Sequence, residues 1–540
     1  MSNQKTKKYI PADGLAGLKE NFSKDALSGF LVFLLAMPLS LGIAKASNFP
    51  MIFGLVTAIV GGVIVSFFMG SRLSIKGPAA GLIVIAAGSV TAFGDGEIGW
   101  HLALGVVVVA GLIQVLFGVF KLGKLADFFP SAAIHGMLAA IGIIIMAKQL
   151  HLLLGINPSE LKGKEPLQLL AMLPSSIVHE NAHLAEIGIA CLLIMVLMNF
   201  VKNDKVKKIP APLVVLAVAI PLGFALHIKT DGQIANFALV KIGSLSEAFK
   251  NGLVNVDFSG ITAHTGIFIQ YVILYSLIGS LESLLTAKAV DGMDPYKRKT
   301  DYNKDLIGVG IGNTISGILG GLPMISEVAR SSANVGYGAR TRWANFFHGL
   351  FLLLAILVAV PFIEMIPNVA LAAMLVFVGF RLAHPRQFSH ALHIGKEQLV
   401  VFTVTILVTI STDLLMGVGS GILLEMVINL INGASLKNLF KTNVEVRIEN
   451  GDFLMVVKDD LIFSNLLGFK KKFLNIPAGQ QVTIDMSEAK IVDHTCLVTI
   501  NGLVDSYVDD GGKVNVIGFE NHRQLAADPT STRVNKLISN

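Results

Sequence analysis

One acidic residue, Glu282, interrupts a long apolar stretch at 264–289. A carboxylate in the middle of a bilayer costs about 2.5–3.5 kcal/mol on insertion scales, so an acid in such a place is a functional candidate by default. Thr286 follows four residues later and therefore lies on the same face of the predicted helix. The alternative interpretation is a neutral glutamate that hydrogen-bonds to a neighbouring helix.

Two short apolar segments begin with glycine and proline: KGPAAG leads into 78–94, and GGLPMIS leads into 324–336. Each is the third segment in a group of seven. Short, interrupted segments at matching positions of two halves point to the binding site of a transporter. Taken singly, each pattern is also explained by a helix kink or by close helix packing.

The second of these segments continues into Glu327 and Arg330, three residues apart on one helix face. The charge of Arg330 would raise the local concentration of anions. An acid beside an anion site is unfavourable unless it is protonated or paired. The alternative is an ion pair between Glu327 and Arg330 that neutralises both charges.

The histidines have no spacing typical of a metal site. His135 lies in a predicted span and is interpreted as a packing residue, with a proton relay as the alternative. His384, His390 and His393 fall in a stretch for which we expect a solvated basic loop.

No pattern typical of an enzyme is present. The chain lacks a Walker P-loop, GxSxG and HExxH. Cys191 and Cys496 can form neither a disulfide framework nor a CxxC metal site. We therefore expect no enzyme, no catalytic residues, no resident metal and no direct use of ATP.

Long apolar runs must position these residues. The 540 residues are 53% hydrophobic and only 15% charged, whereas soluble domains carry about 25% charged residues. About fourteen runs approach the roughly 20 residues that a membrane-spanning helix needs. Because each half contains seven spans, an odd number, the second half inserts with inverted topology. The predicted spans are 25–44, 50–69, 78–94, 101–120, 131–150, 184–202, 209–227, 264–289, 305–320, 324–336, 341–360, 367–380, 397–412 and 416–434.

Loop charges predict the orientation, because lysine and arginine are enriched on the cytoplasmic side of a membrane. Both termini are expected in the cytoplasm. The same loops account for the net charge of +6 without a nucleic-acid partner. The inside loops would hold Arg72, Lys76, Lys121, Lys124, Lys202, Lys205, Lys207, Lys208, Lys297, Arg298, Lys299, Lys304, Arg340, Arg342, Arg381, Arg386 and Lys396.

Beyond Lys441 the composition is that of a soluble domain. VEVRIENGDFLMVV predicts a hairpin that turns at Asn450-Gly451, QQVTIDMS and KVNVIGF predict strands, and Thr495–Val508 predicts a helix. We therefore expect a cytoplasmic segment at 1–23, a transmembrane transport domain at 24–436 and an α/β domain at 441–540.

Several segments together resemble the SulP family of sulfate permeases and related anion transporters. They are ESLLTAKAVDGM, GNTISGILGGLPMISEVARSSANVGYGARTR, GPAAG and, in the tail, VTIDMSEAKIVDHTCL. The resemblance covers nearly the whole chain. It implies a polytopic α-helical membrane protein with a 7+7 inverted repeat, a core and a gate domain, a cytoplasmic STAS domain and a homodimer.

The resemblance places the anion between the N-termini of the third and tenth helices. The exposed amides there would be those of Ala79, Ala80, Gly81, Ile325 and Ser326. Helix N-termini expose unpaired N–H groups and a partial positive charge, so two facing ends would hold an anion.

The resemblance also implies roles for side chains. Arg330 matches the family pattern, whereas a small residue usually stands at the position of Glu327. An acid and a threonine spaced like Glu282 and Thr286 bind sodium in sodium-coupled bicarbonate transporters of the family. The acid here is glutamate rather than aspartate, which leaves proton coupling open and Glu327 as a further coupling candidate.

Two further positions bear on type and regulation. Leu39, in MPLSLG, is closer to bicarbonate-type than to sulfate-type members. Thr495 aligns with a position that is phosphorylated in bacterial STAS domains, although His494 breaks the usual small-residue pattern there.

The sequence thus predicts a secondary active transporter of a small inorganic anion in the cell (inner) membrane. Bicarbonate is favoured and sulfate is the alternative, with coupling to sodium or protons. No cofactor is expected beyond a bound sodium ion. An anion channel or sensor and a nucleobase-type permease are rival functions, and the STAS-like tail is evidence against the permease.

Overall fold

The computed structural model describes residues 10–123, 129–203, 206, 209–232, 234–243, 255–449, 451–509 and 511–536. The predicted inside-loop residues Lys124, Lys205, Lys207 and Lys208 lie outside these ranges, as does Asn450 of the predicted turn. The chain divides into two compact units, one of Met1–Gly123 with Ile141–Arg381 and one of Lys124–Ala140 with Leu382–Asn540.

The first half of the membrane region contains seven spans, the third of which is broken. The span that begins with α2 continues through a π-helical turn and a 3₁₀ turn, and a short strand precedes the third span. Helix α5 is shared between the two units. The elements are α1 (Gly14–Ala46), α2 (Met51–Ile59), η1 (Val60–Ile64), η2 (Val65–Phe67), β1 (Lys76–Pro78), η3 (Ala80–Leu82), α3 (Ile83–Ala92), α4 (Gly96–Val119), α5 (Ser131–Leu153), η5 (Pro158–Leu161), α6 (Pro166–Val178), α7 (Ala182–Phe200) and α9 (Ala211–Ala225).

The second half repeats this order, and its third span is also preceded by a strand. The elements are α11 (Gly260–Ala263), α12 (Thr265–Met293), α13 (Tyr302–Ile318), β2 (Met324–Ser326), α14 (Val328–Gly336), α15 (Trp343–Val358), α16 (Val360–Ile363), α17 (Asn368–Leu382), α18 (Pro385–Ile394), α19 (Lys396–Ser411) and α20 (Leu414–Ile431).

Every predicted span coincides with a helix, which confirms the polytopic 7+7 fold. Seven of the described helices are long and apolar enough to cross a membrane on their own. Others are shorter because a strand or a π or 3₁₀ turn completes the span, as at α2 and α3.

One expectation about a loop is wrong, and two further helical features were not part of the prediction. The stretch 385–394 is helix α18 rather than a loop, since Pro385 at its first turn and the His384 side chain cap its start. Helix α6, between the fifth and sixth spans, was not expected. Helix α1 begins at Gly14, inside the segment predicted as 1–23, because Asp13 caps it there.

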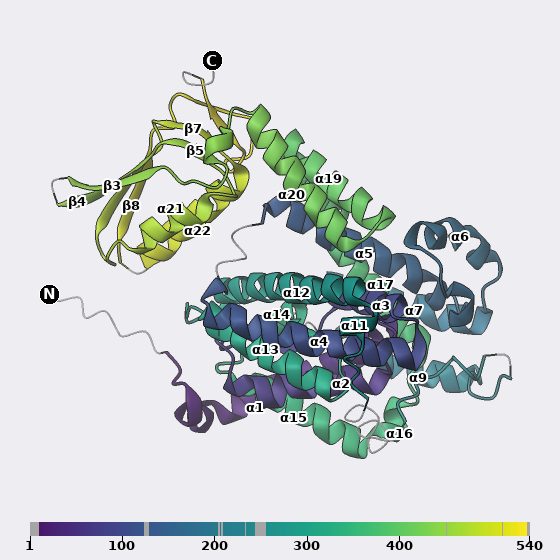
Figure 1. Cartoon of the computed structure of the whole chain (residues 1–540). Coiled ribbons are helices and arrows are strands. Elements are labelled where there is room, and N and C mark those ends of the chain that lie inside the picture. The colour runs from purple at the N-terminus through teal and green to yellow at the C-terminus, as the bar shows by residue number, and fades with distance from the viewer. Residues whose placement is uncertain are drawn as a thin grey trace. The chain divides into compact units, whose positions relative to one another are not determined.

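Small residues bring the helices of the first unit close together. Helices α4, α12 and α13 lie side by side (Figure 1). A methyl group on Gly111 of α4 would lie 2.8 Å from the carbonyl oxygen of Gly310 on α13, and one on Gly310 would lie 2.6 Å from that of Gly111. Glycine at both positions therefore allows the backbone contact that membrane helices use in place of a hydrophobic driving force.

The C-terminal region of the second unit fits the expected STAS-like domain. The predicted hairpin, two strands and helix are present as β3–β4, β6, β8 and α22, and further elements were not expected. One sheet has the order β3-β4-β6-β8 and the other β5-β7-β10-β9. The elements are β3 (Val444–Glu449), β4 (Asp452–Val457), β5 (Asp459–Leu461), α21 (Leu466–Leu474), β6 (Gln481–Asp485), β7 (Ala489–Val492), α22 (His494–Asp509), β8 (Lys513–Ile517), β9 (His522–Gln524) and β10 (Arg533–Asn535).

Candidate functional site

The two broken spans of the first unit meet through their strands. Strand β1 pairs antiparallel with β2, with Lys76 opposite Ser326 and Pro78 opposite Met324. This short ladder satisfies backbone groups that would otherwise be unpaired at membrane depth. Each strand leads directly into a helix, so the N-termini of α3 and α14 both start from the ladder.

Asparagine side chains hold the ladder in place. Asn313 on α13 binds both sides of the Met324 backbone, since its Oδ1 accepts from the amide at 2.5 Å and its Nδ2 donates to the carbonyl at 3.1 Å. On the other strand, Asn345 Oδ1 accepts from the Lys76 amide at 3.1 Å. The ends of α3 and α14 are therefore fixed by buried polar side chains.

A buried ion pair lies at the start of the ladder. The Lys76 ammonium lies 2.6 Å from Asp305 Oδ2, and both side chains are almost fully buried. Lys76 also donates to Ser326 Oγ. Asp305 Oδ1 accepts from the backbone amides of Gly70 and Ser71 at 3.2 and 3.1 Å. The assignment of Lys76 to a loop was thus wrong, because a partner from α13 neutralises its charge.

Helix α12 places Glu282 against the start of α3. A methyl group at Gly81 would lie 2.1 Å from Glu282 Oε2, so only glycine leaves room for the carboxyl there. Glu282 Oε1 is buried and has no hydrogen-bond partner in the described part of the chain. Thr286 is buried one turn further along α12. The neighbouring Ser283 Oγ accepts from the Ser326 amide at 3.1 Å.

At the start of α14, Glu327 and Arg330 are oriented differently. Glu327 Oε2 accepts from the Arg330 backbone amide at 2.8 Å and so caps the helix. The Arg330 guanidinium is fully buried and donates to the Pro78 carbonyl at 3.2 Å. Its Nε and Nη1 have no partner among the described residues. The two side chains of this helix start therefore contact different groups instead of pairing with each other.

The structure brings the predicted site residues into one region. Ala79, Ala80 and Gly81 start the third span, while Ile325 and Ser326 belong to the strand paired with β1. Helix α12 packs against both segments. The Ser326 amide, however, already binds Ser283. The amides of Ala80 and Gly81 at the start of η3 precede the first intrahelical hydrogen bond and so can bind an anion.

Sequence reasoning missed Lys76, Asp305 and Asn313 as parts of this region. One available signal was that Lys76 directly precedes the intramembrane Gly77-Pro78 break. A lysine at such a place needs a buried acid, and Asp305 is the first residue of the predicted span 305–320 in the other half.

The histidine and threonine candidates lie elsewhere, in the second unit. His135, His390 and His494 line one small cavity. No group of histidine, cysteine and acidic residues in the described ranges could hold a metal ion. Thr495 is buried, and its Oγ1 accepts from the Ser131 amide at 3.2 Å.

Known proteins resemble this chain over most of its length. Residues 22–405 match the model of the sulfate permease family. The bicarbonate transporter BicA of Picosynechococcus sp. is 25% identical over 96% of this chain and 91% of its own length. YvdB of Bacillus subtilis, which carries a provisional assignment as a sulfate transporter, is 25% identical over 93% of this chain and 92% of its own.

Solved structures share the fold. The transmembrane domain of a cyanobacterial BicA matches with a TM-score of 0.64 and 25% identity, covering 74% of this chain and 98% of that one. SLC26A9 matches with a TM-score of 0.64 and 14% identity, covering 93% and 85%. With the apolar helices and the paired broken spans, these findings show that this multi-pass membrane protein belongs to the sulfate permease family of anion transporters.

Proposed function

We propose that the protein is a secondary active transporter of bicarbonate that binds its anion at the start of α3, beside the α14 end, and couples transport to sodium or protons. The observation that supports this most is the placement of the Glu282 carboxyl against Gly81. The proposed coupling group, Glu282, then lies next to the amides at the N-terminus of α3. Binding at one would change the free energy of binding at the other.

Attraction for an anion has two sources here. The first amides of η3 lack intrahelical acceptors and carry the positive end of the helix dipole. Arg330 adds a buried positive charge with two nitrogens that lack partners in the described chain. A buried, incompletely paired guanidinium favours an anion nearby, because desolvation leaves its charge uncompensated.

The coupling role rests on the oxygens of α12. Glu282 Oε1 has no partner among the described residues, and Thr286 presents a hydroxyl one turn away on the same face. These oxygens suit a sodium ion, and the carboxyl alone suits a proton. Either cation would neutralise Glu282 and so lower its repulsion of the anion.

A monovalent anion fits this arrangement better than sulfate. Glu282 and Glu327 are close enough to interact electrostatically. For a divalent anion both this repulsion and the attraction by Arg330 double, and two carboxylates against one guanidinium make the net change unfavourable. BicA is a bicarbonate transporter with 25% identity, and Leu39 of the MPLSLG segment supports the same choice. Sulfate remains the second candidate because YvdB is equally similar.

We further propose a homodimer in the cell (inner) membrane with both termini in the cytoplasm. The excess of basic residues in the predicted inside loops supports that orientation. The core is proposed to move against the gate in an elevator-like or rocking exchange. The family match removes the nucleobase permease as a rival, and a channel remains to be distinguished.

The test is uptake into proteoliposomes from a panel of anions, with sodium and pH gradients imposed separately. We expect bicarbonate to accumulate under one of the gradients. Accumulation beyond the anion's own electrochemical gradient excludes a channel. Accumulation of sulfate but not bicarbonate would overturn the substrate assignment.

A further inference from the structure

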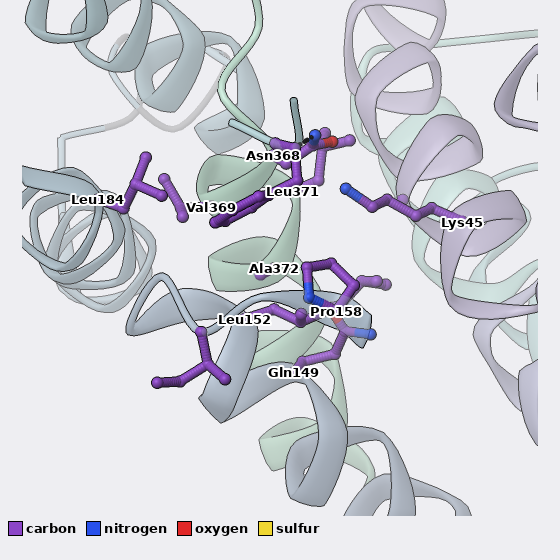
Figure 2. A pocket seen from close by; sticks show the side chains of 13 residues that line it. Lys45, Gln149, Leu152, Pro158, Leu184, Asn368, Val369, Leu371 and Ala372 are labelled. Atoms are coloured by element: carbon purple, nitrogen blue, oxygen red, sulfur yellow. Dashed lines mark hydrogen bonds between the residues drawn. The ribbon is translucent and has the colours of Figure 1, made fainter. Parts of the chain in front are cut away.

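A small cavity lies in the first unit at the C-terminal end of α1. The last turn of α1, the last turns of α5 and the first two turns of α17 line it, together with Leu184 of α7 and residues between the helices (Figure 2). Its polar lining residues are Lys45, Gln149 and Asn368. Because α1 crosses the membrane once, this cavity faces the side opposite to the N-terminus.

Lys45 points its ammonium group into this space (Figure 2). The side chain leaves the α1 backbone and extends toward α17, so the ammonium does not turn back to the carbonyls at its own helix end. Within the described ranges no carboxylate forms an ion pair with Lys45. The residue is partly buried between these helix ends. An ammonium that is withdrawn from water without a counter-ion is costly, and a bound anion would supply the missing charge.

The surroundings add to the positive charge. Lys148 on α5 is close enough to repel Lys45, and its Nζ donates to Asn48 Oδ1 at 3.4 Å. The acid that attracts Lys148 is Asp95, which also lies 3.6 Å from the ammonium of Lys162. Neither Lys45 nor the cavity therefore receives a direct negative partner from the described neighbours.

Two amides at the cavity have unused hydrogen-bonding capacity. Asn368 Nδ2 donates to the carbonyls of Phe237 and Leu239, both at 2.7 Å, while its Oδ1 has no partner among the described residues. The Gln149 side chain also lines the space, and it makes no hydrogen bond within the described chain. The cavity thus offers a cation, an amide and an acceptor to one occupant. An oxyanion that keeps one proton, such as bicarbonate, matches all three.

We propose that Lys45, with Gln149 and Asn368, forms an entry subsite that takes up a small oxyanion from the membrane face opposite the N-terminus. This inference rests on the proposed anion transport and adds a second, peripheral binding place. The free space is only about 20 Å³, the room of about one water-sized sphere. A bicarbonate ion therefore binds there when these helix ends separate, and the helices close over the empty subsite.

The experiment uses the full chain in vesicles of known orientation and measures KM for bicarbonate separately from each face. Lys45→Met keeps the length and removes the charge. We expect KM from the face opposite the N-terminus to rise about fivefold or more, since electrostatic attraction of an ion raises its association rate by tenfold or more. KM from the other face and kcat should stay near the wild-type values. Lys45→Arg should restore the wild-type KM.

The matched control is Lys162→Met, which removes an exposed lysine from the region of Asp95 and should change neither KM. Gln149→Leu provides a second variant, with a smaller rise on the same face, if Lys45→Met does not fold. An unchanged KM in both Lys45→Met and Gln149→Leu, or an equal rise on both faces, would overturn the inference. Absence of transport by the wild type would instead refute the proposed function.

Discussion

The two broken spans of the first unit, β1–η3–α3 and β2–α14, can be compared across the ladder that joins them. Both have a short strand that leads into a helix, and the strands are held by Asn345 and Asn313 respectively. Their side chains differ. The start of α14 carries its own cap, Glu327, whereas η3 begins at Ala80 without a side-chain cap.

The two halves of the repeat thus share one backbone arrangement at these helix starts but differ in the side chains that bind there. At α14 the helix end is already occupied by the carboxylate of Glu327, the residue directly before that helix. At α3 the acid comes from another helix, through Glu282 against Gly81. A group supplied by a separate helix can move away from the helix end without unfolding it. We therefore expect the α3 end to bind the exchanging ion and the α14 end to provide a fixed frame.

The largest effect is expected when the buried ion pair beside the β1–β2 ladder is broken. Lys76→Met leaves Asp305 buried without its partner, and breaking such a pair costs about 3–5 kcal/mol. The protein should express poorly or lose most of its thermal stability in detergent. Because two apolar side chains replace a buried ion pair at little cost, Lys76→Met with Asp305→Leu should recover part of that loss. A single variant as stable as the wild type would show that the pair does not hold the ladder.

A smaller and more specific effect is expected at Gly81. In Gly81→Ala the new methyl group displaces the Glu282 carboxyl, which is the flexible end of a side chain, so folding should survive. Gradient-driven uptake should fall about tenfold, the equivalent of about 1.4 kcal/mol. Combining Gly81→Ala with Glu282→Asp shortens the acid and should restore part of the uptake.

The control for this substitution is Gly336→Ala on α14, where an added methyl group meets no atom within 4 Å. It should transport like the wild type. Equal losses in the two alanine variants would mean that the α3 end has no special role.

The smallest effect is expected at Glu327. Glu327→Gln keeps a cap oxygen for the Arg330 amide and removes a negative charge from the α14 end. Affinity for sulfate should rise relative to bicarbonate by about tenfold, because a divalent anion gains most when an acid is neutralised. Competition between the two anions in uptake measures this ratio. An unchanged ratio would show that Glu327 does not interact with the transported anion.

Most of the fold could be predicted from the sequence, because apolar runs and Gly-Pro breaks report directly on spans and on helix starts. The region around Gly81 and Ser326 could be placed in the same way. The Lys76–Asp305 pair was missed, since the two residues are far apart in sequence and a lysine next to a span is usually interpreted as a loop charge. Helix α18 was missed because its polar residues conceal a short helix between two spans.

The orientation of the Glu327 and Arg330 side chains also could not be predicted from their spacing in the sequence. Residues three apart on a helix suggest an ion pair. Glu327 instead stands just before α14, where its carboxylate caps the helix, and Arg330 extends back to Pro78. A cap and a pair differ by the position of the first helical residue, which sequence patterns locate least well.

The most direct test of the account is the coupling measurement on Glu282→Gln, which removes the charge and keeps the size of the side chain. Proteoliposomes with a sodium gradient or a pH gradient report driven uptake, and tracer exchange without a gradient reports anion binding and movement. We predict that driven accumulation is lost under both gradients while exchange persists. If Glu282→Gln still accumulates the anion under either gradient as the wild type does, Glu282 is a structural residue and the account is contradicted.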